Sequence, residues 1–265
     1  MHVSIIQTSL HWENPESNRV MFAQKLASLQ GHTDLIVLPE MFSTGFSMNA
    51  KSLAEPMVGQ TMDWMCELSM KMNAAIVGSF ICVEQGKYFN RLIFMRPDGH
   101  FDFYDKKHLF SLGTENEHYT AGGKRITVEW RGWRICPLIC YDLRFPAWSR
   151  NTTGNFVSGY SPHYDILIYV ANWPSRRAHH WRSLLMARAI ENQSFVVGAN
   201  IAGVDGNDFE YSGDSAIIDY SGQPIAQIPD GEEGIITVKI SLEDLKDYRT
   251  QLPFLADADV FEIKA

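Results

Sequence analysis

The chain alternates between short apolar runs and segments in which apolar residues recur at helical spacing. Asp34–Leu38 (DLIVL) and Asp165–Val170 (DILIYV) are mostly apolar runs of strand length, which is typical of strands covered on both faces. In Met62–Met72 the apolar side chains instead fall on one face of a helix. The pattern therefore predicts an α/β protein in which strands and helices are interspersed.

Residue types that favour turns and helix ends indicate where the other predicted elements begin and end. Asn14 followed by Pro15 favours a helix start, and Gly31 ends that helix after Leu29. The other predicted strands are Val3–Gln7, Ala75–Val83, Tyr88–Met95, Phe101–Tyr104, Arg125–Trp130, Trp133–Ile139, Phe195–Asn200, Ser215–Tyr220, Pro224–Ile228 and Ile235–Ile240. The other predicted helices are His179–Asn192 and Glu243–Arg249. These elements fit one domain with either one large mixed sheet or two packed sheets.

The composition is that of an ordinary globular chain. Of its 265 residues, 45% are hydrophobic and 20% are charged, which excludes a disordered, collagen-like or coiled-coil protein. The net charge of −8 disfavours binding to nucleic acid, and no apolar stretch reaches the roughly 20 residues of a membrane span. Four cysteines without metal-ligand spacing and the lack of a targeting segment favour a cytoplasmic protein with no metal site.

The last residues of the chain differ from the rest. We expect a single domain over residues 1–250 and a C-terminal tail over residues 251–265. The tail is apolar for a terminus, with Leu252, Phe254, Leu255, Val260 and Phe261. It is expected either to pack across a subunit boundary or to fold back on its own core.

Polar side chains follow two of the predicted strands at the edge where loops of an α/β sheet converge. Glu40, in LPEMF, could act as a general base if burial raises its pKa, or could cap the following loop. Lys106, in YDKKHLF, could stabilise a developing oxyanion, or could form an ordinary solvated pair with Lys107. His108 beside them is either a base or a histidine bonded to the backbone.

Cys140, in ICPLICYDLRFP, comes where the strand Trp133–Ile139 ends and the chain turns. A cysteine at such an elbow lies near backbone N–H groups, which favour a thiolate and can bind an oxyanion. The alternative is a buried thiol acting as a small hydrophobe, as expected of Cys136. With Glu40 and Lys106, Cys140 would complete a thiol-dependent site. The chain has no GxSxG, GxxxxGK[ST], GxGxxG or HExxH motif that would point to another chemistry.

The motifs LPEMFSTGF, YDKKHLF and CYDLRFP, in this order, resemble those of the nitrilase superfamily of carbon–nitrogen hydrolases. The resemblance is collinear over nearly the whole chain and implies that Glu40, Lys106 and Cys140 are the catalytic set. It also implies a four-layer α-β-β-α sandwich of two mixed β-sheets flanked by helices. A homodimer or higher homo-oligomer and the absence of any cofactor are further implications.

The resemblance selects residues that the spacing alone leaves open. It places the family lysine at Lys106 rather than Lys107. It also implies a supporting glutamate in ENEHYTAG, for which Glu115 is the first choice and Glu117 the second.

The implied mechanism proceeds through a thioester. Glu40 takes the thiol proton, and Cys140 attacks the amide carbon. Lys106 and the backbone N–H of Tyr141 bind the oxyanion, and Glu115 holds Lys106 or the substrate amide in register. Glu40 then activates the water that hydrolyses the thioester.

Three further segments, VANWP, ARAIENQ and YSGDS, are similar to the omega-amidase branch. This implies hydrolysis of the terminal amide of a small 2-oxo-dicarboxylate monoamide, such as 2-oxoglutaramate, to ammonia and the oxo acid. The alternatives are an N-carbamoyl amino acid amidohydrolase, a nitrilase, or a non-catalytic binding protein of this fold. A redox-sensing role of the Cys140 thiol is compatible with catalysis.

A small carboxylate substrate needs a local cation in this acidic protein. The candidates are Arg144, Arg176, Arg177 and His179, although Arg144 could instead brace the elbow by pairing with Asp142.

Three other side chains are candidates for substrate contact. Trp173 and Phe42 could each form an apolar wall beside the thiol or belong to the core. Asn172 could donate a hydrogen bond to the substrate or cap its own loop.

Overall fold

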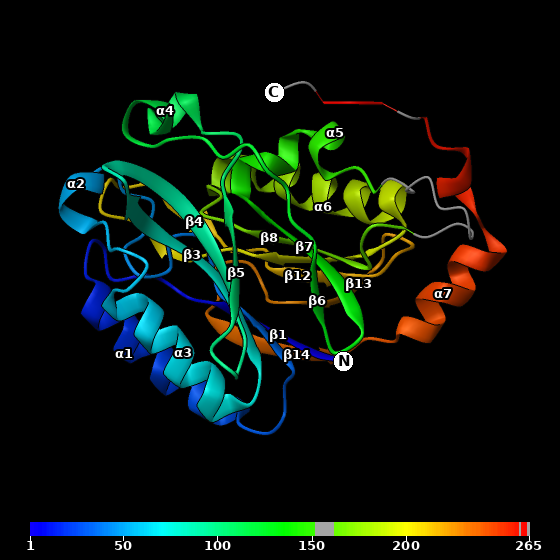
Figure 1. Ribbon diagram of the computed structural model, residues 1–265, viewed down its shortest axis with the longest axis horizontal. Coiled ribbons are helices and arrows are strands. Elements are labelled where there is room, and N and C mark those ends of the chain that lie inside the picture. Colours follow the sequence, from blue (N-terminus) through cyan, green and yellow to red (C-terminus); the bar gives the residue numbers. More distant parts are fainter. Residues whose placement is uncertain (152–161, 260, 264–265) are drawn as a thin grey trace.

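The computed structural model, which describes residues 1–151, 162–259 and 261–263, contains two six-stranded β-sheets packed face to face (Figure 1). The first sheet has the order β14-β1-β2-β3-β4-β5. Its strands are β1 His2–Gln7, β2 Leu35–Val37, β3 Ala75–Glu84, β4 Lys87–Met95, β5 Phe101–Asp105 and β14 Gly234–Lys239. Strands β1, β2 and β3 are parallel, and the others pair antiparallel.

The second sheet has the same design, with the order β13-β12-β9-β8-β7-β6. Its strands are β6 Val128–Trp130, β7 Trp133–Ile139, β8 Ile166–Val170, β9 Phe195–Ala199, β12 Ala216–Ile218 and β13 Pro224–Gln227. Strands β7, β8 and β9 are parallel. A separate two-stranded hairpin joins β10 Ala202–Val204 to β11 Glu210–Ser212.

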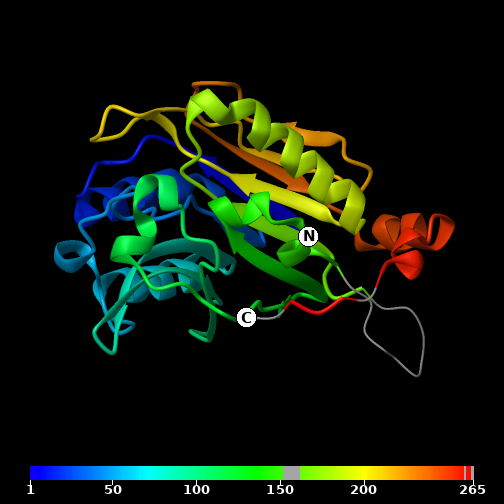
Figure 2. The ribbon, with the colours of Figure 1, turned by 90° about the horizontal axis from the view of Figure 1, so that it is seen from above.

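Helices cover the outer faces of both sheets (Figures 1 and 2). Helices α1 Pro15–Leu26 and α3 Gln60–Met72 pack on the first sheet, and α6 Ala178–Asn192 packs on the second. The remaining helices are α2 Ala50–Leu53, α4 Glu115–His118, α5 Pro146–Ser149 and α7 Leu242–Gln251. The predicted four-layer α-β-β-α sandwich is confirmed.

Alternation along the strands explains why the central strands are apolar throughout. In β1, Val3 and Ile5 join the core between the sheets, whereas Ile6 packs beneath α1 and α3. In β2, Leu35–Val37 divides in the same way, with only its middle residue facing the helices. Successive side chains of a strand point to opposite faces, so a strand covered on both faces needs apolar residues at every position.

Most predicted elements are present, with shifts of one to three residues at their ends. The first helix stops at Leu26 and continues as a 3₁₀ turn over Ala27–Leu29, and the Asn14 side chain caps it by accepting from the N–H of Ser17 at 3.1 Å. The strand predicted from Arg125 begins only at Val128. The hairpin β10–β11 and the short helices α2, α4 and α5 were not predicted from the sequence.

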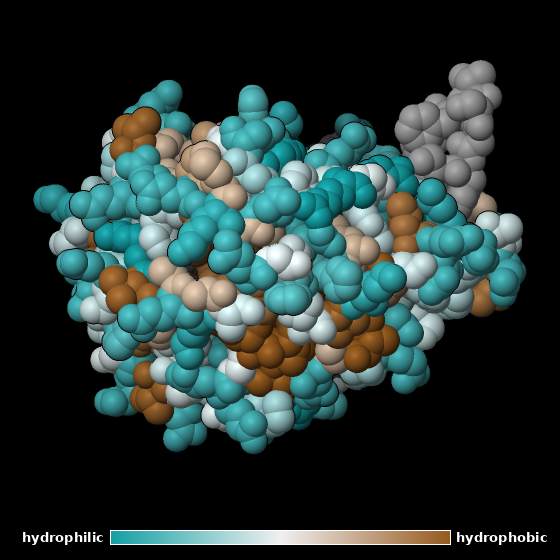
Figure 3. All heavy atoms as spheres, turned by 90° about the horizontal axis from the view of Figure 1, so that it is seen from below, coloured by the Kyte–Doolittle hydropathy of each residue, from teal (hydrophilic) through white to brown (hydrophobic). Residues whose placement is uncertain are grey.

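The surface seen from below is mainly hydrophilic, with hydrophobic residues in separate patches (Figure 3). In the tail, Leu255 is buried, while Phe254 and Phe261 are exposed. Val260 lies outside the described residues. Within the described part of the chain, no helix is both long and apolar enough to cross a membrane.

Candidate active site

Glu40 lies on the loop that leaves the carboxyl end of β2, and its side chain has no exposed surface. Oε1 accepts hydrogen bonds from Asn90 Nδ2 and Lys106 Nζ, each at 2.8 Å. Oε2 accepts one from the backbone N–H of Asn172 at 2.8 Å, and Nδ2 of Asn172 donates to the Glu40 carbonyl at 2.7 Å. Because Asn90 belongs to β4 and Asn172 follows β8, these bonds hold the carboxylate between the two sheets.

Lys106 follows β5, and its buried ammonium is shared by two carboxylates. It donates to Glu40 at 2.8 Å and to the two oxygens of Glu115 at 3.0 and 2.9 Å. Glu115, also buried, accepts a further bond from the N–H of Phe110 at 2.6 Å. Burial acts to lower the pKa of Lys106, but Glu115 and Glu40 outweigh it and raise the pKa above its ordinary value. Lys106 is therefore an ammonium at neutral pH.

Cys140 stands at the elbow where β7 ends and the 3₁₀ turn Cys140–Arg144 begins. Its φ of 41° lies in the left-handed region, which is uncommon for a residue with a side chain and concentrates at functional sites. The first N–H groups of a helical turn have no carbonyl partner inside the turn. The elbow therefore offers the backbone N–H of Tyr141 beside the thiol.

The thiol of Cys140 is neutral at rest. Burial, and then the carboxylate of Glu40, raise its pKa well above the ordinary value, and Lys106 opposes them. The thiolate is the nucleophilic form of cysteine, so reaction needs a base that removes this proton. Glu40 is the carboxylate placed to do so.

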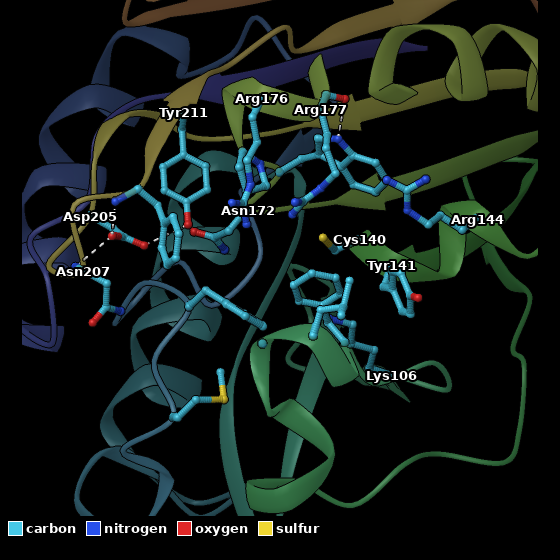
Figure 4. A pocket seen from close by; sticks show the side chains of 18 residues that line it. Lys106, Cys140, Tyr141, Arg144, Asn172, Arg176, Arg177, Asp205, Asn207 and Tyr211 are labelled. Atoms are coloured by element: carbon cyan, nitrogen blue, oxygen red, sulfur yellow. Dashed lines mark hydrogen bonds between the residues drawn. The ribbon is translucent and has the colours of Figure 1, made fainter. Parts of the chain in front are cut away.

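A cavity of about 130 Å³ lies over Cys140 (Figure 4). Four candidates from the sequence, Cys140, Lys106, Asn172 and Tyr141, contribute to its lining. Its aromatic walls are Phe46, Phe110, Trp173, Phe209 and Tyr211. The lining is therefore largely apolar, with a few polar groups near the thiol, as in many small-molecule sites.

Three arginines, Arg144, Arg176 and Arg177, also line this cavity (Figure 4). Their guanidinium groups lie over the rings of Trp173, Phe209 and Phe110, at 4.7, 5.3 and 5.3 Å from the ring centres respectively.

None of the three forms an ion pair with a carboxylate of the described residues. Burial, followed by the charges of Arg176 and Arg144, lowers the pKa of Arg177. A cluster of mutually repelling cations is therefore available for an anionic ligand.

The hairpin β10–β11 and its loop supply four of the pocket residues that were not predicted from the sequence, namely Asp205, Asn207, Phe209 and Tyr211. Figure 4 shows Asp205, Asn207 and Tyr211 together on the side of the pocket away from Tyr141. The Asp205 carboxylate accepts bonds from the hydroxyl of Tyr211 at 2.8 Å and from the N–H groups of Asn207 and Phe209 at 2.8 and 3.0 Å. These bonds fix the loop that carries Phe209 to the guanidinium of Arg176.

Phe42 is not a pocket residue, contrary to the sequence prediction. It is fully buried on the helix side of the first sheet, where it contacts Phe22 and Trp64 at ring-centre distances of 5.7 and 5.5 Å. The positive φ of Met41, 43°, reorients the chain between Glu40 and Phe42.

The other open alternatives are decided by contacts. Asn172 donates its backbone N–H to Glu40 and also lines the pocket. Trp173 lines the pocket and also belongs to the core, where its ring lies 5.5 Å from that of Trp181, measured between ring centres. Arg144 does not brace the elbow through Asp142, whose carboxylate is bonded to His108 and Tyr104.

The remaining candidates separate by exposure. Glu117 is exposed, whereas Glu115 is buried against Lys106. His179 and Lys107 are not among the pocket-lining residues. In the described ranges, no group of three or more His, Cys, Asp and Glu side chains is arranged to hold a metal ion.

Comparison with known proteins gives full-length matches. The sequence model of the family described as carbon-nitrogen hydrolase matches residues 3–250. The omega-amidase YafV of Yersinia enterocolitica is 44% identical over 261 residues, covering 98% of each chain. The 2-oxoglutaramate amidase of Bacillus subtilis is 32% identical over 258 residues, covering 96% of each chain.

One solved structure is similar along the entire chain. It is a CN-hydrolase superfamily protein from Xanthomonas campestris, crystallised with an arsenic adduct in its active site. It superposes with a TM-score of 0.96 at 43% identity, covering 100% of this chain and 99% of that one. The fold and the comparisons together define a hydrolase of the nitrilase superfamily. The chain belongs to the carbon–nitrogen hydrolase family, so the predicted resemblance is confirmed.

Proposed function

We propose that this protein is an omega-amidase that hydrolyses the terminal amide of a small 2-oxo-dicarboxylate monoamide, such as 2-oxoglutaramate, to ammonia and the oxo acid. The observation that carries the proposal is the pairing of two features in one cavity. A neutral thiol lies beside a buried carboxylate and a buried ammonium, and three arginines without acidic partners among the described residues line the same space. The names of the relatives from Yersinia enterocolitica and Bacillus subtilis support the same substrate class.

The first step is attack by the thiol. Glu40 accepts the proton of Cys140 while the sulfur forms a bond to the amide carbon. The charge that develops on the amide oxygen is stabilised by Lys106 and by the backbone N–H of Tyr141, which are fixed before the substrate arrives. Glu115 holds the ammonium of Lys106 in place through two hydrogen bonds.

Collapse of this intermediate breaks the carbon–nitrogen bond. Glu40 returns the proton to the leaving nitrogen, so ammonia departs and a thioester remains on Cys140. A water molecule then attacks the thioester carbon and gives its proton to Glu40. The carbon–sulfur bond breaks, the oxo acid is released, and the thiol regains its proton from Glu40.

The arginines determine which amides bind well. A carboxylate at the far end of the substrate can pair with Arg144, Arg176 or Arg177, which line the cavity and form no ion pair with an acid of the described residues. A hydrogen bond to a charged group contributes about 1.5–3 kcal/mol, which favours an anionic substrate locally in a protein with a net charge of −8.

A substrate panel with ammonia detection tests the proposal. We expect release from 2-oxoglutaramate to exceed that from an N-carbamoyl amino acid or a nitrile of the same length, each of which would yield ammonia on hydrolysis. Faster release from either analogue would reassign the substrate within the family. No release from any of the three would contradict an amidase function altogether.

We further propose a homo-oligomer in the cytoplasm, with residues 1–250 as one domain and residues 251–265 at a subunit boundary. The family match ends at residue 250, and the tail exposes Phe254 and Phe261, which supports this division. Light scattering of the full chain and of a truncation at residue 250 would test it. An unchanged mass of the particle after truncation would exclude a role of the tail in assembly. Cell fractionation would test whether the protein is in the cytoplasm.

A further inference from the structure

His108 has a contact that neither of its predicted roles includes. Its ring Nδ1 lies 2.7 Å from Oδ1 of Asp142, and its backbone N–H donates to the same oxygen at 3.0 Å. Because a carboxylate only accepts hydrogen bonds, the Nδ1 atom carries the proton. The ring also stacks on Phe145, with a centroid distance of 3.7 Å and an interplanar angle of 8°. His108 is therefore held rigidly, although it does not line the pocket.

The carboxylate of Asp142 accepts hydrogen bonds from the segment around Lys106 and from the end of β7. Its Oδ2 accepts from the hydroxyl of Tyr104 at 2.8 Å and from the backbone N–H just before Cys140 at 3.1 Å. Asp142 has no exposed surface. Tyr104 stands two residues before Lys106, His108 stands two residues after it, and Asp142 stands two residues after Cys140. One buried carboxylate thus joins the chain on both sides of Lys106 to the cysteine elbow.

Tyr104 is itself fixed by other bonds. Its hydroxyl oxygen accepts from Trp148 Nε1 at 3.0 Å and from the backbone N–H of Lys107 at 3.2 Å, while its own proton goes to Asp142. The connection is therefore a network centred on two buried side chains, Tyr104 and Asp142, with His108 partly exposed at its edge. It spans the two sheets, because Tyr104 lies in β5 and Asp142 follows β7.

We infer that Asp142 and His108 are positioning residues for the amidase reaction, which keep the ammonium of Lys106 in register with the thiol of Cys140 and the N–H of Tyr141. The inference rests on the proposed function. Lys106 and Tyr141 N–H bind one oxyanion but come from different sheets, so their separation depends on a link between those sheets. A misplacement of about 1 Å in such groups can cost about a hundredfold in rate.

The arginines of the pocket lie outside this network. Loss of the link should therefore lower kcat and leave KM nearly unchanged. A residue that only stabilised the fold would instead lower the melting temperature and the fraction of active enzyme, without changing kcat per active site.

Two substitutions at one position test this role. His108→Phe keeps an aromatic ring against Phe145 and removes the Nδ1 donor, whereas His108→Asn offers an amide nitrogen close to the place of Nδ1. We expect kcat per active site to fall about tenfold or more in His108→Phe, with KM within about twofold of wild type. His108→Asn should recover most of that loss. Equal kcat in wild type and His108→Phe, or an equal loss in both variants, would overturn the inference.

A second measurement does not depend on the substrate. Alkylation of Cys140 by iodoacetamide reports how well Glu40 and Lys106 are placed to produce and hold the thiolate, with Cys140→Ala as the blank for the other cysteines. The rate should fall in His108→Phe and be restored in His108→Asn. If the wild type releases no ammonia from any amide, the proposed function fails, while the alkylation rates still decide the positioning role. Equal rates in all three proteins would contradict it.

Discussion

The Nζ atom of Lys106 lies 2.8 Å from Oε1 of Glu40, and neither side chain is exposed to solvent. Glu115 shares the same ammonium, so one buried cation compensates two buried carboxylates. Removing one partner of a buried ion pair leaves charge without compensation, which costs about 3–5 kcal/mol. The position of Lys106 therefore matters for stability as well as for the oxyanion.

Lys106→Met should show both effects. We expect its free energy of unfolding in urea to fall by about 3 kcal/mol or more, because Glu40 and Glu115 lose their partner. Turnover should fall by at least about a hundredfold, the usual cost of an oxyanion donor. Lys107→Met is the matched control and should keep wild-type turnover. A stable, active Lys106→Met would exclude the proposed role of this lysine.

The two glutamates of ENEHYTAG should behave differently. Glu115→Gln weakens the hold on Lys106, so kcat should fall by about tenfold to a hundredfold, as expected when a catalytic group is misplaced. Glu117→Gln changes an exposed side chain and should leave kcat unchanged. Steady-state ammonia release from both variants makes the comparison. The reverse order of effects would transfer the supporting role to Glu117.

Arg177→Gln, Arg176→Gln and Arg144→Gln test the anion site. At least one of them should raise KM for 2-oxoglutaramate by about tenfold or more, since a charged hydrogen bond contributes about 1.5–3 kcal/mol. The corresponding amide without a carboxylate should not distinguish these variants from wild type. Arg96→Gln, which removes the same charge from a pair with Asp102, is the control. Unchanged KM in all three variants would place the substrate carboxylate elsewhere.

The strands that carry the site could be predicted because burial on both faces leaves a pattern in the sequence. DLIVL and DILIYV are strands β2 and β8, and Glu40 and Asn172 follow them at the same edge of the sandwich. The elbow at Cys140 was predictable for the same reason, since the apolar run of β7 ends there. Family motifs supplied Glu115, which has no such pattern of its own.

Other features leave no local signal. Strands β10 and β11 are three residues each, too short for a period to be recognised, so the pocket residues of their hairpin were missed. Phe42 was misplaced because its position close to Glu40 suggested a wall beside the thiol, whereas it shares the helix-side cluster with Ile36 and Leu38. The bond between His108 and Asp142 joins residues 34 positions apart, which follow strands of different sheets. A single sequence does not show which carboxylate forms a hydrogen bond with which histidine.

The buried Cys136 predicts a loss of stability at alkaline pH. Burial raises the pKa of its thiol from about 9 to about 12, so the unfolded chain releases this proton at lower pH than the folded protein. The stabilisation is complete below about pH 9 and is lost as the pH rises toward 12. Between pH 8 and pH 10 the wild type should lose about 1 kcal/mol more unfolding free energy than Cys136→Ala. Parallel pH profiles of the two proteins would contradict this expectation.

The proposed reaction depends most directly on the thiol of Cys140. The decisive measurement is ammonia release from 2-oxoglutaramate by Cys140→Ala, beside wild type and Cys136→Ala, with all three shown to be folded. We expect Cys140→Ala to be slower by about five orders of magnitude, as for other covalent nucleophiles, and Cys136→Ala to remain active. Ammonia release by Cys140→Ala at a rate near that of wild type would contradict the thioester mechanism and the site built around it.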